Sequence, residues 1–252
     1  MKLAVSTSLG VFFVVETSRG SAPHPYHHGN LGPALVEAAL ALLHETQDWA
    51  FSLREVARRA GVSHNAPYKH FPEKRDLLAA VAARGFEALA ERTLAALEGL
   101  TDARARLLAC GRAFVALGIA NPALYRLMFS AVLTSPDAGR PPIEKAAAAK
   151  ARAIVDATLA DAVQSGALPA SMANPSERGA ASLAMWSLMH GLTMLAIDDF
   201  VGPPKDVETL VDPMLGALLN GIASHPPALP ANIWMAPRLS QRHADDPVTQ
   251  TS

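Results

Sequence analysis

The 252-residue chain has one cysteine, few aromatic residues and almost no alternation of polar and β-branched residues. The single cysteine, Cys110, excludes an internal disulfide and a thiolate metal cluster. Its neighbours, RLLACGRAF, are typical of an apolar helix, so inert packing is its expected role, and such sparing use of cysteine suits a reducing cytoplasm. Aromatics make up only 6% of the chain, while Ala and Leu dominate. This composition predicts an all-α protein.

A net charge excess is also lacking. The formal net charge is −1, which argues against a general polyanion binder, and with half of the residues hydrophobic the chain is globular. The charge is unevenly placed, however. Residues 51–76 hold six Lys or Arg and three acidic residues, a balance of +3 that leaves −4 for the rest of the chain. One short stretch is therefore a candidate for contact with an anionic partner.

The usual enzyme motifs are missing too. The chain has no phosphate-binding P-loop, no G-x-G-x-x-G after a strand, no G-x-S-x-G and no H-E-x-x-H. The stretch HPYHH (24–28) could hold a metal, but adjacent histidines are a weak signal. We therefore predict a protein that is not an enzyme and has no cofactor or resident metal. The classes left open are a DNA-binding regulator and a helical ligand-binding or interaction module without DNA activity.

The two ends of the chain differ from its middle. MKLAVSTSLGVFFVV has the cationic start and apolar stretch of a secretory signal, but no clean cleavage site follows, and a functional arm or a poorly ordered extension fits as well. We expect a disordered extension over 1–25, with the fold beginning near Tyr26. The segment 224–252 contains five prolines and no periodicity, so we expect a disordered tail.

Helical spacing and capping residues divide the region between these ends. Helices are expected over 31–46, from Ser52 to Gly61, and over 63–71, 73–100, 103–120, 122–129, 143–165, 176–200 and 207–223, with Asn30 as the first cap and a loop at 134–142. The helix over 176–200 is apolar on nearly all sides, which predicts enclosure in a core or in a subunit interface.

Residues 52–71, SLREVARRAGVSHNAPYKHF, have the order of a helix-turn-helix: a capped helix, a glycine turn and a short second helix. In such motifs the second helix lies in the DNA major groove. His64 and Asn65 can bond base edges there, and Tyr68, Lys69 and His70, with Lys74 nearby, can reach phosphates; Ser52 and Ser63 complete the candidate contacts. We expect Val56, Ala57, Val62 and Phe71 to hold the two helices together, and Arg58 and Arg59 to belong more to a solvated face than to the DNA contact.

Pro67 is unusual within this second helix. Its ring and missing N–H are tolerated only near a helix start, and a proline also disfavours helical dihedrals in the residue before it. We therefore expect Ala66 to depart from helical dihedrals and regular α geometry to begin only at about Pro67.

The stretch FSLREVARRAGVSHNAPYKHFPEKRDLLAAVA resembles the N-terminal DNA-binding domain of TetR-type transcriptional regulators. The stretch YHHGNL (26–31) resembles the opening of one branch of that family, and MWSLMHGL resembles the branch's C-terminal Trp-x-x-x-His-Gly pattern at Trp186, His190 and Gly191. Pro67 departs from the Leu found in many members. The resemblance implies a helix-turn-helix domain over 26–76, a linking helix to about 100, and a regulatory and dimerisation domain over 77–223.

The same resemblance implies how such a protein works. A cytoplasmic homodimer, paired through its last two helices, would bind a near-palindromic DNA operator, and a small effector would shift it to a form that releases DNA; repression is the commoner mode and activation stays open. The middle helices would enclose a pocket for a small, mostly apolar effector. Candidate lining residues are Phe114, Leu117, Tyr125, Met128, Phe129, Trp186, Met189, His190 and Met194. Each is also explained as core, His190 most readily, and Gly191 would permit close helix approach.

Overall fold

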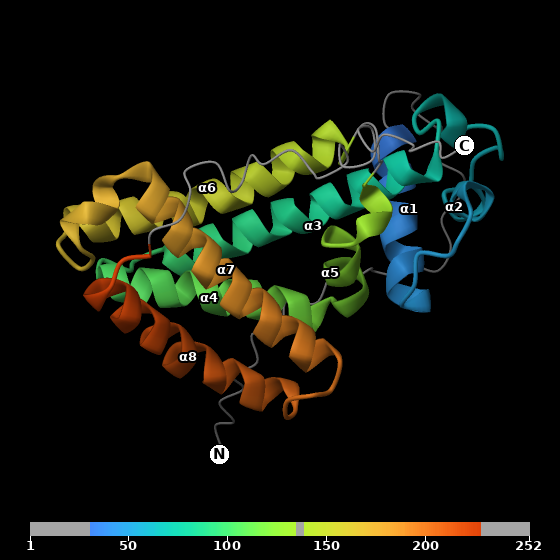
Figure 1. Ribbon diagram of the computed structural model, residues 1–252. Coiled ribbons are helices and arrows are strands. Elements are labelled where there is room, and N and C mark those ends of the chain that lie inside the picture. The colour runs from blue at the N-terminus through green and yellow to red at the C-terminus, as the bar shows by residue number, and fades with distance from the viewer. Residues whose placement is uncertain (1–30, 135–138, 228–252) are drawn as a thin grey trace, which may run out of the picture.

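The computed structural model describes residues 31–134 and 139–227, which fold as a bundle of α-helices (Figure 1). The elements are α1 (Leu31–Thr46), α2 (Leu53–Arg59), the 3-10 turn η1 (Pro67–Lys69), α3 (Lys74–Leu97), α4 (Ala103–Ala120), α5 (Pro122–Met128), η2 (Ala131–Leu133), α6 (Pro142–Gln164), η3 (Ala170–Ala173), α7 (Pro175–Ile197) and α8 (Pro204–Ser224). The described residues include no strand, so the predicted all-α class is confirmed. The expectations for 1–25, Asn30, HPYHH and most of the tail lie outside these residues.

The first helices form a small unit at one end of the molecule (Figure 1). Ser52 begins α2 with the expected capping box: its Oγ accepts a hydrogen bond from the Glu55 N–H at 3.2 Å, and its own N–H donates to the Glu55 carboxylate at 2.6 Å. Gly61 follows α2 with φ of +69°, a conformation that favours glycine. Val56 and Ala57 are fully buried, as expected for residues that hold the two helices of the motif together.

The segment around Pro67 differs from the prediction in two ways. Ala66 keeps helical dihedrals (φ −60°, ψ −41°), and the segment after it is a 3-10 turn over Pro67–Lys69 instead of a regular α-helix. Both expectations were wrong for one reason. The Ala66 N–H already closes a turn on the Ser63 carbonyl at 2.9 Å, so Pro67 follows a formed turn at a point where its missing N–H costs nothing. The Phe71 N–H then bonds to the Pro67 carbonyl at 2.8 Å, and Pro72 ends the segment.

The central element is α3, which runs from the N-terminal unit through the middle of the molecule (Figure 1). Its 24 residues span about 36 Å. The Glu73 N–H at its start donates to the Asp76 carboxylate at 3.0 Å. The helix ends at Leu97 and not near residue 100, because Gly99 takes φ of +73° and turns the chain. One rigid helix thus belongs to both halves of the protein.

The C-terminal half has a core of its own, formed by α4, α6, α7 and α8. The helix α7 ends at Ile197, before Phe200, as Asp199 adopts φ of +58°. The helix α8 begins at Pro204, earlier than expected, with a proline in its first turn where the missing N–H is harmless. Among single helices in the described part of the chain, α7 is long and apolar enough to cross a membrane. It contacts α4, α6 and α8 within the bundle.

At Gly118, α4 packs against Thr193 of α7. A Cβ atom added there would overlap with Thr193 Cγ2 and would lie 2.9 Å from Tyr125 Cδ2. Gly118→Ala is therefore expected to lower the free energy of unfolding by about 1–2 kcal/mol, because overpacking outweighs the gain in helix propensity. Urea unfolding measures the change. Gly221→Ala in α8, where nothing lies within 4 Å of the added atom, is the matched control and should be neutral or stabilising. Equal effects of the two substitutions would contradict the close contact.

Candidate DNA-binding surface and effector pocket

The predicted DNA-contact residues gather on one exposed surface. Ser63, His64, Asn65, Tyr68, Lys69 and His70 are all exposed on the segment that follows α2, and Ser52 is exposed at the start of that helix. Tyr68 is 47% exposed although it is a large aromatic residue. A large aromatic side chain that is about half exposed is available to a partner outside the protein.

Arg58 and Arg59, the last two arginines of α2, differ in their contacts. The Arg59 guanidinium donates two hydrogen bonds to the Glu45 carboxylate, at 2.5 and 2.6 Å, and so ties α2 to α1. Arg58 is exposed on the same helix. Arg59 is therefore held by a partner within the protein, and its expected place away from the DNA contact stays a prediction.

Lys74 stands at the first position of α3, beside the exposed segment. Its ammonium lies 5.4 Å from the centroid of the Phe51 ring, and the Phe51 side chain is buried. Desolvation by the surrounding protein lowers the pKa of Lys74, while the nearby carboxylates of Asp48 and Glu55 oppose this shift. The cation–π contact orients the Lys74 side chain and so holds its ammonium group near the start of α3.

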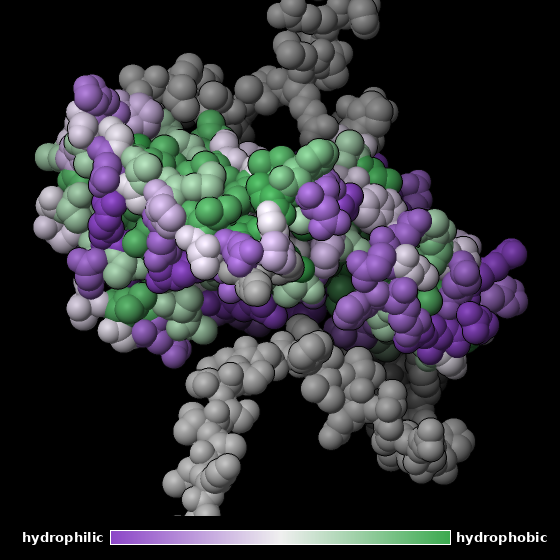
Figure 2. All heavy atoms as spheres, turned by 90° about the horizontal axis from the view of Figure 1, so that it is seen from below, coloured by the Kyte–Doolittle hydropathy of each residue, from purple (hydrophilic) through white to green (hydrophobic). Residues whose placement is uncertain are grey.

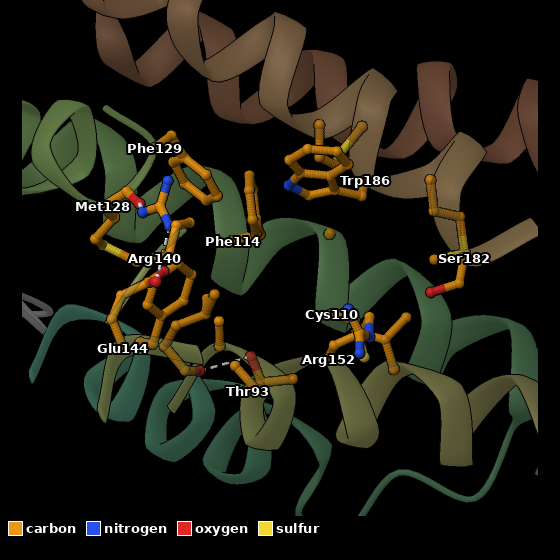
Figure 3. A pocket seen from close by; sticks show the side chains of 18 residues that line it. Thr93, Cys110, Phe114, Met128, Phe129, Arg140, Glu144, Arg152, Ser182 and Trp186 are labelled. Atoms are coloured by element: carbon orange, nitrogen blue, oxygen red, sulfur yellow. Dashed lines mark hydrogen bonds and ion pairs between the residues drawn. The ribbon is translucent and has the colours of Figure 1, made fainter. Parts of the chain in front are cut away.

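A cavity of about 340 Å³ lies in the C-terminal half between α3, α4, α6 and α7 (Figure 3). Of the nine predicted effector-binding residues, five line it: Phe114, Met128, Phe129, Trp186 and Met189. The walls are almost entirely apolar, with Phe86 and Leu89 of α3 on one side and Met185 of α7 on another. Such a cavity is of the size and character of a small-molecule site.

The other four predicted residues are outside the lining of this cavity. Leu117 is buried in the core, and Tyr125 is only 1% exposed, with its hydroxyl 2.7 Å from His190 Nδ1. His190 also stacks against the Tyr125 ring and contacts Phe129 edge-on, so it is satisfied by its neighbours. Met194 lies further along α7, beyond the cavity. Helical periodicity predicts that all four side chains point into the protein. It does not show whether a side chain lines the cavity or packs in the surrounding core.

Five polar or charged lining residues of the cavity were not predicted from the sequence: Thr93, Arg140, Glu144, Arg152 and Ser182. Arg140 and Glu144 form a pair. The Arg140 guanidinium donates from Nε to the Glu144 carboxylate at 2.8 Å and from its two Nη atoms to the carbonyls of Ser130 and Met128, at 3.3 and 2.5 Å. Arg140 lies in the segment 134–142 that was expected to be a surface loop. The available signal was an Arg and a Glu four residues apart at a helix start, which is common on exposed helices and so did not single them out.

Within the described part of the chain, no element packs over the outer face of α7 and α8. Figure 2 shows hydrophobic side chains gathered over these helices, whereas the end of the molecule that holds the exposed segment is mostly hydrophilic. Leu195 is 46% exposed and Leu210 38% exposed on this face. Gly191 was expected to permit close helix approach, but among the described residues nothing lies within 4 Å of an added Cβ. Its open surface is available to another molecule.

His190 makes the stability of this half depend on pH. Burial lowers its pKa from the usual 6.5 and raises that of its partner Tyr125 above the ordinary range, so the neutral pair is favoured. The unfolded chain therefore binds a proton at His190 at a higher pH than the folded chain does. Stability contributed by neutral His190 is complete above pH 6.5 and is lost as pH falls through that value toward the lower folded pKa. In thermal melts, the wild-type midpoint should fall more steeply below that pH than the midpoint of His190→Gln. Parallel profiles would contradict this.

Two family models match the chain. One, described as "Bacterial regulatory proteins, tetR family", matches residues 35–81, and the other, "Tetracyclin repressor-like, C-terminal domain", matches residues 107–218. The first covers most of α1, α2, η1 and the start of α3, and the second covers α7 and the cavity lining apart from its α3 residues. The chain belongs to the TetR family of transcriptional regulators. The predicted family is thereby confirmed, and the helix-turn-helix unit is its DNA-binding domain.

Solved structures share this TetR fold. A protein of unknown function from Rhodococcus sp. RHA1 is 29% identical, with a TM-score of 0.64, over 80% of this chain and 100% of that one. FadR from Bacillus subtilis, in complex with stearoyl-CoA, is 17% identical with a TM-score of 0.58, over 75% and 98%. A TetR variant from Acinetobacter baumannii AYE, in complex with minocycline, is 21% identical with a TM-score of 0.54, over 75% and 94%. No curated protein sequence matches this chain.

Proposed function

We propose that this TetR-family regulator is a ligand-responsive repressor that binds a near-palindromic operator as a homodimer in the cytoplasm. The observation that carries the proposal is the continuity of α3. This helix begins at Lys74, beside the exposed DNA-binding segment, and further along contributes Phe86, Leu89 and Thr93 to the wall of the cavity. A molecule that fills the cavity therefore presses on the same rigid body that carries the DNA-binding unit.

The proposed DNA contacts divide into two kinds. Asn65 and His64 stand at the start of the second helix of the motif, where side chains face base edges, and Asn can pair with adenine through two hydrogen bonds. Tyr68, Lys69 and Lys74 are placed to bond phosphates, with Ser52, Ser63 and His70 at the edges of the same surface. The first kind supplies sequence preference and the second supplies affinity and register.

The proposed dimer forms through the outer face of α7 and α8. This face is the exposed apolar region seen in Figure 2, and Gly191 on it leaves space for a partner helix to approach closely. A two-fold dimer uses the same patch on both copies and presents two DNA-binding units related by symmetry. Near-palindromic DNA is the matching target, with half-sites separated by whole helical turns.

Regulation follows from the spacing of these two units. An effector in the cavity would favour a position of α3 in which the units no longer match successive grooves on one side of the duplex. The related folds that hold stearoyl-CoA and minocycline give precedent for effectors with large apolar parts. For this chain the apolar walls support a small, mostly apolar effector, and nothing in them suggests a catalytic role.

Gel-shift titration at several salt concentrations tests the proposal. The regulator should prefer one palindrome over bulk DNA by a large factor, and its affinity should fall steeply as salt rises. A helical ligand-binding module without DNA activity would show neither property. The sign of regulation is read from a reporter gene placed behind the selected operator: a rise in expression on deletion of the protein indicates repression, and a fall indicates activation.

A further inference from the structure

The effector cavity has the shape of a slot with polar groups at its two ends. Along α6 its lining runs from Glu144 to Val155, a rise of about 16 Å. Figure 3 shows Arg140 and Glu144 together at one end, with Ser182 at the other and Phe114 between them. The rest of the lining is mostly aromatic, Met, Leu, Val and Ala side chains. Its other polar members include Thr93 and Arg152, and the Arg152 guanidinium is balanced by the Asp156 carboxylate, 3.9 Å away. An elongated molecule with an apolar middle fits this distribution.

The pair at the first end is electrically balanced. Glu144 is only 2% exposed, and its Oε2 accepts from Arg140 at 2.8 Å. The same guanidinium also bonds two backbone carbonyls, at the end of α5 and at the start of η2. Arg140 therefore has no unbalanced positive charge to offer an anion, and a ligand carboxylate would meet the charge of Glu144. Burying a charge without a partner is costly, so this end disfavours a charged group of either sign.

Hydrogen-bonding capacity nevertheless remains at both ends. Among the described residues, Glu144 Oε1 has no hydrogen-bond partner, although the side chain is buried and lines the cavity. The Ser182 hydroxyl, on a residue 4% exposed, is likewise unpartnered in the described part of the chain, and Figure 3 shows it pointing into the cavity. Buried polar groups are normally hydrogen-bonded, so two such groups facing one slot indicate where a ligand completes them.

We propose that the effector is an elongated, uncharged molecule whose hydrogen-bonding groups, such as hydroxyl or carbonyl, meet Glu144 at one end and Ser182 at the other. This inference rests on the proposed function, since it defines the ligand of the same pocket. Glu144 is then the residue that selects against anionic analogues. Its side chain compensates Arg140, and replacing it by glutamine keeps the shape and the hydrogen bond from Arg140 Nε but removes the compensating charge.

Three probes of equal chain length test the proposal: lauryl alcohol, laurate and laurylamine. Isothermal titration of the full chain should show the alcohol binding about tenfold more tightly than either ion. In Glu144→Gln, laurate should gain about tenfold relative to the alcohol, because Arg140 is then uncompensated. Tighter binding of laurate than of the alcohol by the wild-type protein would overturn the proposal, as would an unchanged order in Glu144→Gln.

Ser182→Ala tests the second end with a folding control. The substitution should weaken the binding of a diol with hydroxyl groups at both ends by about tenfold. It should leave the affinity for lauryl alcohol nearly unchanged, because the single hydroxyl of that probe is expected at Glu144. Ser187→Ala, at an exposed position of the same helix, should alter neither. Equal affinities of wild type and Ser182→Ala for the diol would overturn the second contact. If no probe binds but the protein still recognises its operator, the proposed effector class is wrong and the regulator function stands. If the protein binds neither a probe nor an operator, the proposed function itself is rejected.

Discussion

Leu195→Arg is expected to convert the protein from a dimer to a monomer and to reduce its operator affinity by roughly 100-fold or more. The Leu195 side chain is 46% exposed in the protomer, within the apolar face of α7 and α8. In the proposed dimer it is buried against its symmetry mate, so two arginines would face each other without counter-ions. Light scattering after size-exclusion chromatography gives the molecular mass, and a gel shift on the selected operator gives the affinity.

Leu94→Arg provides the matched control. Leu94 is an exposed leucine of α3, 52% exposed, and lies outside the α7 and α8 face. The control should remain dimeric and bind the operator with wild-type affinity, which separates a local interface effect from a general effect of added charge. A dimer that survives Leu195→Arg, or a monomer that binds the operator as well as the wild type, would place the interface elsewhere.

Lys74→Met and Asn65→Ala are expected to affect DNA binding in different ways. Methionine retains an apolar stem against Phe51 but loses the charge, so binding should weaken on every duplex, and the salt dependence should lose about one unit of slope for each copy of the chain. Asn65→Ala should instead cost about 1–3 kcal/mol on the preferred operator and relax preference at one base position of each half-site. Titrations over a salt series and over single-base operator variants measure both effects.

Lys150→Met controls for the loss of a positive charge far from the DNA-binding unit. Lys150 is exposed on α6, in the C-terminal half. It should leave both the salt slope and the sequence preference unchanged. If Lys74→Met behaves like this control, Lys74 does not contact phosphate; if Asn65→Ala retains full discrimination, the base-reading residue is another.

Local sequence rules predicted those parts of the fold that local interactions decide. The capping box of Ser52 and Glu55, the glycine turn at Gly61 and the proline at the start of α5 each depend on a few neighbouring residues. The exception is Ala66, whose dihedrals were expected to be disfavoured by Pro67. There a turn closed by the preceding backbone outweighed the steric preference of the pair.

The pocket was predictable only in part, because its lining depends on tertiary packing. Phe114, Phe129 and Trp186 stand out as aromatic residues of the middle helices, and they do line the cavity. Arg140 and Glu144 were missed because an Arg in an expected loop and a Glu at the start of an expected helix give no sign of burial. Their enclosure depends on tertiary contacts, among them the hydrogen bonds from Arg140 to the Met128 and Ser130 carbonyls. Conversely, His190 and Tyr125 satisfy each other outside the cavity, a pairing across 65 residues that no periodicity reveals.

The dimer face illustrates a different limit. The sequence showed that α7 is apolar on nearly all sides and left open whether a core or a subunit interface encloses it. The structure divides the helix: Met185, Met189 and Leu192 are buried in the protomer, while Leu195 is exposed. The core therefore encloses one side of the helix, and the proposed dimer would cover the other side. Composition alone could not assign the two sides.

Selection of bound duplexes from a random pool, followed by native mass spectrometry of the protein on the selected duplex, tests the central claim most directly. The account predicts an enriched inverted repeat whose two half-sites are spaced by whole turns of the DNA, and a complex that contains two copies of the chain, or a multiple of two, on each duplex. Enrichment of no sequence, or a single chain bound to a site without symmetry, would contradict it.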